Sequence, residues 1–465
     1  MKTRYYILTI AALLIAASCN VSKKYKRPDV TATNLYRDSS ATDTNTMAAM
    51  PWRSLFVDTV LQNLIQEGID RNLDLKTAVL KIAEANATLK ESKAAYFPSL
   101  DAGATVTKAK ASQAAQSFPP DLGIDLNTTT YQAQLTASWE VNVWGQLSSL
   151  KRQAVADFLE SDAAKRAVQT QLIADIANDY YTLLSYDKQL AITIQTVKND
   201  SVDVETNKNL LEGNVVTGAA VVQSEANKYA AAITIPDLEQ SIRETENALC
   251  ILLARAPGPI KRNKLEDQEP ISNVNAGIST QLLRNRPDVQ EAEYTFMAAF
   301  ENTNVAHSYF YPTLTITAEG GLSTLQLKDL FNNSIFYNLV GGLTQPIFDQ
   351  GKNKARYRIA KAQQLEAFNS YQQAILTAGQ DVANDLYSYK QAVKKQEIRK
   401  KELSALEKSV DYTKELLTYS SATNYTDVLT SEQNLLAAQL ASVSDRLQQL
   451  QAIVNLYTAL GGGWK

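Results

Sequence analysis

The stretch TTYQAQLTASWEVNVWG, residues 129–145, alternates apolar and polar side chains along most of its length. A period of two predicts a β-strand with one apolar and one polar face. The apolar residues are Tyr131, Ala133, Leu135, Ala137, Trp139, Val141 and Val143. The polar residues between them are Gln132, Gln134, Thr136, Ser138, Glu140 and Asn142. The alternation leaves open what the apolar face contacts and what the polar face is for.

Other segments with similar alternation indicate that strands come in pairs. Apolar residues alternate with polar ones at Leu100, Ala102, Ala104 and Val106, and again at Leu314, Ile316 and Ala318. The segment FYNLVGGLTQPIF, residues 336–348, alternates poorly and is the weakest of the four. We therefore expect strand pairs within residues 99–143 and 313–348. They form either the wall of a soluble β-sandwich or part of a membrane barrel, and in a barrel several chains must contribute strands.

Between the strand pairs the sequence predicts helices far longer than a globular domain needs. No Gly or Pro occurs between Gly145 and Gly213, and a helix over that span would be roughly 100 Å long. An apolar seam with helical spacing runs along it and is interrupted by Asp187. Its members are Ile173, Ile176, Tyr180, Leu183, Leu190, Ile194 and Val197. The second half repeats the plan from Gly351 to about Leu460.

The chain carries an internal tandem duplication. Similar segments recur at separations of 214, 206 and 207 residues, marked by the pairs Pro98 and Pro312, Gly145 and Gly351, and Glu225 and Glu432. Each half reads as helix, strand pair, very long helix, turn and long helix. We assign the halves to residues 51–260 and 261–465. Each half therefore contains a long helical hairpin.

The N-terminus is a predicted targeting segment. A basic start, MKTRYY, precedes the apolar core ILTIAALLIAAS and then Cys19, which predicts a signal peptide at residues 1–18. Small residues before Cys19 resemble a bacterial lipobox, which implies lipidation of Cys19. The alternative is plain secretion with an incidental cysteine. Residues 19–50 then read as lipid anchor and extended linker, and the KKYKR run at 23–27 as a flank of the processing site.

The composition argues against a nucleic-acid-binding protein and against an enzyme. The net charge is −3 and no basic block stands out. The single histidine, His307, cannot supply a typical metal cluster or catalytic triad, and no phosphate-binding glycine loop occurs. We predict no catalytic residue, metal or cofactor. Acidic pairs are assigned to solvated helix faces, and Cys250 to a buried apolar position.

Residues 282–316, LLRNRPDVQEAEYTFMAAFENTNVAHSYFYPTLTI, resemble the signature of TolC/OprM/NodT-like outer-membrane efflux lipoproteins. Supporting matches are PWRSLFVDTVLQNLIQEGIDRNLDLKTA (51–78), WEVNVWG (139–145), LTQPIFDQGKNKARYRIAKAQ (343–363) and the YKRP after the lipobox. The resemblance covers nearly the whole mature chain in the right order. It identifies the chain as an outer-membrane factor of a tripartite efflux system.

The resemblance implies a mixed α and β membrane protein that works as a homotrimer. Each subunit would give four strands to one shared β-barrel, continued by a long α-helical barrel in the periplasm. The protein would be lipid-anchored in the outer membrane, contact its lipid, and pass small toxic compounds to the outside. An inner-membrane transporter of the RND type and a periplasmic adaptor would be its partners.

The resemblance also assigns roles to residues of this chain. Adaptor contacts fall on the helical turns, at Gly213, Asn214, Val215, Thr217, Gly218, Ser421 and Asn424. The periplasmic gate falls on Asp427, Thr423 and Tyr419, although Thr423 and Thr430 replace the arginine and second acid of some relatives. Asp427 has an alternative reading as a residue that caps the returning helix. The residues expected to face lipid are Tyr131, Leu135, Trp139, Val141 and Val143.

Two other functions remain open at this point. The same family architecture can serve as the exit duct of a type I-like protein or peptide secretion system. A different class of protein, a coiled-coil lipoprotein that spaces the envelope, would also need long helices. A spacer has no use for strand pairs, so the strands at 99–143 and 313–348 favour a channel.

Overall fold

The computed structural model describes residues 21–30, 35–36, 46–115, 125–270, 276–277, 279–419 and 425–464. These residues divide into two compact units. The sheet unit takes its residues from 1–29, 82–160 and 292–370, and the helical unit from 30–81, 161–291 and 371–465. Each unit draws on both halves of the predicted duplication, so neither sequence half is a compact unit by itself.

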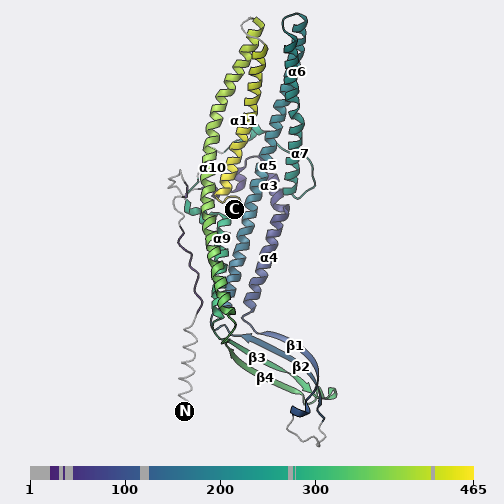
Figure 1. Ribbon diagram of the computed structural model, residues 1–465, viewed down its shortest axis with the longest axis vertical. Helices are drawn as coiled ribbons and strands as arrows, with labels where there is room; N and C mark the ends of the chain where they lie inside the picture. The colour runs from purple at the N-terminus through teal and green to yellow at the C-terminus, as the bar shows by residue number, and fades with distance from the viewer. Residues whose placement is uncertain are drawn as a thin grey trace. The chain divides into compact units, whose positions relative to one another are not determined.

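The sheet unit contains one antiparallel sheet of four strands in the order β1-β2-β3-β4 (Figure 1). Its strands are β1 (Ser99–Lys110), β2 (Asn127–Glu140), β3 (Thr313–Thr324) and β4 (Ile335–Thr344). Short 3-10 turns, η2 (Gln113–Ala115) and η6 (Leu327–Asp329), follow β1 and β3. The sheet confirms the predicted strand pairs, including β4, and joins the two pairs through β2 and β3.

The strand β2 ends at Glu140, so its predicted extension to Val143 is wrong. The Val141 amide still donates to the Leu314 carbonyl at 2.9 Å. The Asn142 side chain then accepts from the Leu147 amide at 3.0 Å, which turns the chain into the next helix. Likewise β4 ends at Thr344 and not at 348, because Pro346 has no amide hydrogen to continue the ladder.

Two very long helices, α5 (Gln146–Glu212) and α10 (Lys352–Tyr419), confirm the helical predictions. They have 67 and 68 residues, or roughly 100 Å each. Each begins directly after a glycine of positive φ, Gly145 or Gly351. The duplication is therefore visible in the matching starts and lengths of the two helices. Two helices of equal length, α4 (Leu73–Ala94) and α9 (Pro287–Ser308), precede the strand pairs.

In the helical unit the chain returns from each long helix. From α5 it returns as α6 (Gly218–Ala232) and α7 (Thr234–Leu252), and from α10 as α11 (Tyr425–Ala459). The short helices are α2 (Trp52–Leu55), α3 (Thr59–Arg71), α8 (Leu282–Asn285), η1 (Met47–Ala49), η4 (Leu265–Asp267) and η5 (Ser279–Gln281). No described helix is long and apolar enough to cross a membrane.

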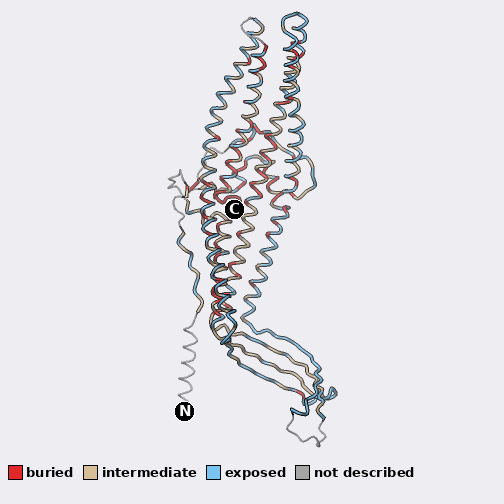
Figure 2. Tube along the Cα trace, viewed as in Figure 1, coloured by how far each residue is buried: buried red, intermediate tan, exposed pale blue. Residues whose placement is uncertain are grey.

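The core of the helical unit is built by buried side chains of α3, α5 and α11 (Figure 2). The first members of the predicted seam, Ile173, Ile176, Tyr180 and Leu183, are all fully buried. Burial of the seam weakens beyond Asp187, and Ile194 is 49% exposed. Cys250, predicted to be a buried small hydrophobe, is 1% exposed.

The segment at residues 21–29 is docked on α9 within the sheet unit, although its composition suggests a free linker. The Lys23 backbone exchanges two hydrogen bonds with the Asn304 carboxamide, at 3.2 and 2.9 Å. Arg27 pairs with Glu293, and the Tyr25 ring packs edge-on against Phe296 and Phe300. The KKYKR run therefore includes internal contacts and is more than a flank of the processing site.

The C-terminal end of the helical unit gives a first testable prediction. Gly461 has φ +85°, and a Cβ there would lie 2.4 Å from the backbone carbon and oxygen of Asn285. We expect Gly461→Ala to lower the free energy of unfolding by about 1–3 kcal/mol, measured by denaturant titration in detergent. Gly218→Ala is the control, because a Cβ at Gly218 meets no atom within 4 Å. Equal stability of the two variants would contradict this.

Candidate functional site

The register of the sheet places most of the large apolar side chains on one face. Residues directly opposite each other on neighbouring strands point to the same side. The pairs Ala102–Leu135, Trp139–Ile316 and Ala318–Leu339 therefore carry the apolar positions of β2 across all four strands. This apolar face includes Leu100, Val106, Tyr131, Leu135, Trp139, Leu314, Ile316, Leu322, Ile335, Tyr337, Leu339 and Leu343.

The apolar face is exposed within the single chain. Tyr337 is 88% exposed, Leu339 70% and Leu100 69%. A contiguous exposed surface of this kind indicates contact with lipid or with another apolar surface. The opposite, polar face carries Asp101, Thr105, Gln132, Gln134, Thr136, Ser138, Thr315, Thr317, Glu319 and Asn338.

The five residues predicted to face lipid are not all on this sheet. Tyr131, Leu135 and Trp139 lie on the apolar face of β2. Val141 and Val143 follow the end of the strand and lie in the corner that leads into α5. The Trp139 indole donates to the Tyr96 carbonyl at 3.0 Å and so ties the end of β2 to the chain before β1.

The first helical turn, Gly213 to Gly218, closes α5 with a Schellman motif. The Val215 amide donates to the Leu210 carbonyl at 2.8 Å, and the Asn214 amide to Leu211 at 2.9 Å. Asn214 takes the left-handed conformation, with φ 60°. Thr217 then precedes α6 without a side-chain cap bond. The turn therefore holds a fixed shape and presents Val215, which is 69% exposed, to the outside of the chain.

At the second turn, Tyr419 is the last residue of α10 and is 83% exposed. Asp427 is the third residue of α11, which begins at Tyr425, so Asp427 is not the helix cap. Its carboxylate lies in the first turn of α11, where a negative charge interacts favourably with the helix dipole and stabilises the helix. The other predicted residues, Ser421, Thr423 and Asn424, lie outside the described residues, as does Cys19.

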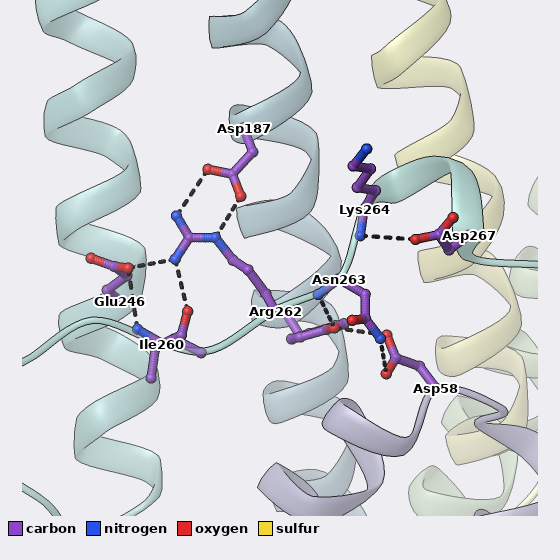
Figure 3. Close-up of polar contacts among 9 residues, drawn as sticks. Asp58, Asp187, Glu246, Ile260, Arg262, Asn263, Lys264 and Asp267 are labelled. Carbon is purple, nitrogen blue, oxygen red and sulfur yellow. Dashed lines mark hydrogen bonds and ion pairs between the residues drawn. The ribbon is translucent and has the colours of Figure 1, made fainter.

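A polar network around Arg262 explains why Asp187 interrupts the seam of α5 (Figure 3). The Arg262 guanidinium donates to both Asp187 oxygens, at 2.5 and 2.9 Å, and to Glu246 of α7 at 2.5 Å. The backbone amide of Ile260, two residues before Arg262, donates to the same Glu246 carboxylate. Asp187 is thus an anchor for the segment that follows α7, which periodicity alone cannot reveal.

Asp58 forms the second half of this network (Figure 3). Its carboxylate accepts from the Tyr180 hydroxyl at 2.7 Å, from the Asn263 side-chain carboxamide at 2.9 Å and from the Gln268 side chain at 2.7 Å. It also accepts from the Val60 amide at 2.7 Å and caps α3. One carboxylate therefore ties α3, α5 and the segment at 263–268 together.

Replacing Arg262 by leucine is expected to cost about 1.5–3 kcal/mol of unfolding free energy, because charge-assisted hydrogen bonds to two half-buried carboxylates are lost. Denaturant titration would measure this. The double variant Arg262→Leu with Asp187→Leu should recover most of the loss by making the seam continuous. Arg71→Leu removes an exposed i,i+4 pair with Glu67 and should cost no more than about 0.5 kcal/mol.

Near the hairpin ends, each long helix is tied to its returning helix by a lysine–glutamate pair. Lys208 of α5 lies 3.0 Å from Glu225 of α6, and Lys414 of α10 lies 2.5 Å from Glu432 of α11. Both members of each pair occupy equivalent positions in the duplication. The second pair also faces two acids of α5, Asp200 and Asp203, whose carboxylate oxygens lie within 4.8 Å of Glu432 and of each other.

Burial shifts the titration of all three acids in this group. Burial first, and then the charges of Glu432 and Asp203, raise the pKa of Asp200 to about 6. Burial also raises the pKa values of Asp203 and Glu432, while the Lys414 ammonium opposes both shifts. Asp200, Asp203 and Glu432 are half-buried, in contrast to the solvated helix faces expected for acidic pairs. The spacing of three residues places Asp200 and Asp203 on one face of α5, which the sequence could show. Their partner Glu432 in α11 is remote in sequence and could not be found in this way.

The family described as outer membrane efflux protein matches residues 64–255 and 278–462, which is most of the chain. The chain belongs to the outer membrane efflux protein family. The match falls in two parts, one before and one after the segment that follows α7. The outer membrane efflux protein fold therefore accounts for the strand pairs and for both long hairpins.

Similar proteins span nearly the whole chain. A probable outer membrane lipoprotein, SilC of Salmonella typhimurium, is 29% identical over 98% of this chain and 98% of its own. The cation efflux system protein CusC of Escherichia coli (strain K12) is 27% identical over 98% and 99%. The open state of the Neisseria gonorrhoeae MtrE outer membrane channel has a TM-score of 0.85 and 25% identity, covering 96% of this chain and 99% of that one.

The family, the mixed α and β fold and the function in efflux are thereby confirmed. This outer membrane efflux protein is a channel component of the outer membrane, and its family is one of transport proteins. The roles of its individual residues stay predictions.

Proposed function

We propose that this outer membrane efflux protein is the exit duct of a tripartite pump and forms a homotrimer around one shared β-barrel. The observation that carries the proposal is the exposed apolar face of the four-stranded sheet. In the described sheet, β1 and β4 are the two edge strands. An open edge cannot face lipid because its backbone groups would stay unpaired. Pairing of β1 of one copy with β4 of the next removes every edge.

In this arrangement the polar face of each sheet lines a water-filled exit. The alternation of β2 then has a role on both sides, with Tyr131, Leu135 and Trp139 toward lipid and Gln132, Gln134 and Thr136 toward the bore. Val141 and Val143 belong to the corner below the membrane. An envelope spacer made of coiled coils would have no use for this sheet, so the channel reading accounts for more of the molecule.

The helical hairpins would form the periplasmic part of the duct. The fixed turn at Gly213–Gly218 suits a docking surface for a periplasmic adaptor, and Ser421 and Asn424, between α10 and α11 in the sequence, belong to the same proposal. Asp427, exposed in the first turn of α11, and Tyr419 suit a gate near these turns. Thr423 belongs to the same proposal. An inner-membrane transporter, of the RND type in this proposal, would supply the energy and select small toxic compounds.

The proposed location is the outer membrane, with a lipid anchor on Cys19. The similar SilC is described as a probable outer membrane lipoprotein, which supports the anchor. Docking of residues 21–29 on α9 would hold the anchored end close to the sheet unit.

The test is conductance of the purified full-length protein in a planar lipid bilayer, combined with its mass in detergent. We expect discrete channels and a mass of three chains. A protein that stayed monomeric and made no channel would overturn the proposal. If channels and a trimer are found, crosslinking in cells at Val215 would show whether an adaptor lies at the first turn.

A further inference from the structure

The group formed by Asp200, Asp203, Lys414 and Glu432 joins the two hairpins of the helical unit. Asp200 and Asp203 belong to α5 of the first hairpin, and Lys414 and Glu432 to α10 and α11 of the second. The oxygens of the three acids lie within 4.8 Å of one another. Three carboxylates against one ammonium leave two negative charges when all four groups are ionised.

The duplication shows that this charge is an addition to the basic plan. The equivalent pair of the first hairpin, Lys208 and Glu225, is a balanced ion pair with side chains 49% and 37% exposed. In the second hairpin, the Glu432 side chain is only 18% exposed and faces two additional acids. A hairpin staple needs one cation and one anion, so Asp200 and Asp203 call for a different explanation.

Polar groups beside the acids also lack hydrogen-bond partners. Asn207, one turn along α5 from Asp203, is 0% exposed, and both atoms of its carboxamide have no hydrogen-bond partner among the described groups. The buried Oδ2 of Asp203 and the hydroxyl of Tyr425 also lack a partner with hydrogen-bond geometry, although Asp203 lies beside Glu432 and Tyr425 beside Asn207. Burial and the charge of Asp203 raise the pKa of Tyr425 to about 12, while the nearby Asn207 carboxamide opposes the shift. Buried polar groups without partners point to a bound water or ion.

The donor set is composed of hard oxygen ligands, which suit Ca²⁺ or Mg²⁺ better than a soft metal. Two oxygens on one Ca²⁺ ion can lie up to roughly 5 Å apart, but on Mg²⁺ only about 4.2 Å. The oxygens of the three acids, all within 4.8 Å of one another, can therefore all reach one Ca²⁺ ion. Two cavities of about 290 and 370 Å³ are both lined by Asp200 and Glu432, and they give an ion a way in.

We propose that Asp200, Asp203 and Glu432 bind a calcium-type divalent cation, with Asn207 and Tyr425 as supporting oxygen groups. The ion would bridge α5 to α11 and so tie the first hairpin to the second. Lys414 would neutralise the remaining charge on Glu432. If the protein is a duct, loss of the ion would release the link between the hairpins and allow the duct to open. That consequence rests on the proposed function, but the ion binding itself does not.

The experiment is calorimetric titration of CaCl₂ into the full-length protein in detergent. We expect saturable binding and a rise in the melting temperature with Ca²⁺, because a ligand that binds only the folded state stabilises it. The variant Asp200→Asn with Asp203→Asn should lose both effects. It should still fold, since it removes repulsion between like charges. Asn207→Leu, which leaves the carboxylates in place, should weaken binding by about tenfold.

The matched control is Glu225→Gln, which breaks the equivalent staple and should leave Ca²⁺ binding unchanged. Ca²⁺ binding that is absent from the wild type, or that survives in the Asn double variant, would overturn the proposal. Stability that depends on pH but not on Ca²⁺ would also overturn it, in favour of a shared proton. If neither the wild type nor any variant conducted ions while the wild type still bound Ca²⁺, the result would count only against the proposed function.

Discussion

Replacing Arg152 by methionine is expected to lower the free energy of unfolding by about 3–5 kcal/mol, because it leaves a buried carboxylate without its cation. Arg152 of α5 donates to both oxygens of Glu301 of α9, at 2.7 and 2.9 Å. The Glu301 side chain is 1% exposed, so water cannot replace the guanidinium. Arg152 also donates to Ser149 and to Ser22, so its loss weakens docking of the N-terminal segment.

Denaturant titration in detergent, followed by tryptophan fluorescence, measures this loss. The double variant Arg152→Met with Glu301→Met is the decisive control, because replacing a buried pair by apolar residues of similar size is often neutral. We expect it to recover most of the stability. A single variant as stable as the wild type would mean that Glu301 finds another partner or is protonated.

Local patterns in the sequence predicted most of the fold. The alternation of β2 and the absence of Gly and Pro from α5 are properties of neighbouring residues, and both elements formed as expected. The ends of β2 and β4 differed from the predicted ones. Val141 and Val143 lie beyond the end of β2 because the Asn142 side chain accepts a hydrogen bond from the Leu147 amide and turns the chain into α5. Alternation with a period of two cannot predict such a side-chain contact.

The polar contacts between remote segments could not be predicted in the same way. Asp187 breaks the apolar seam of α5 because it pairs with Arg262, 75 residues further along the chain. Asp203 and Glu432 are brought together only by packing of the two hairpins. Charge pairs of this type carry no periodic signal, because either partner alone reads as an ordinary surface residue.

A single arginine on the apolar face of β2 is expected to prevent stable insertion into the outer membrane. Leu135 lies in the middle of β2, opposite Ala102 of β1 and Gly320 of β3, and is 52% exposed. Arginine at the middle of a bilayer costs a membrane strand about 2–4 kcal/mol, and a trimer would carry three copies. The measurement is the amount of Leu135→Arg protein recovered from the outer membrane relative to wild type, together with its conductance.

The neighbouring residue provides the matched control, since it points to the other face. Thr136 lies opposite Asp101 of β1 and Glu319 of β3, so an arginine there would sit between two carboxylates on the polar face. Thr136→Arg should therefore insert normally and shift the conductance toward anions by cancelling negative charge in the bore. Equal insertion of the two variants would show that the faces are not lipid and water. Normal insertion of Leu135→Arg with loss of Thr136→Arg would mean that the sheet is inside out, with its apolar face turned to the centre of the assembly.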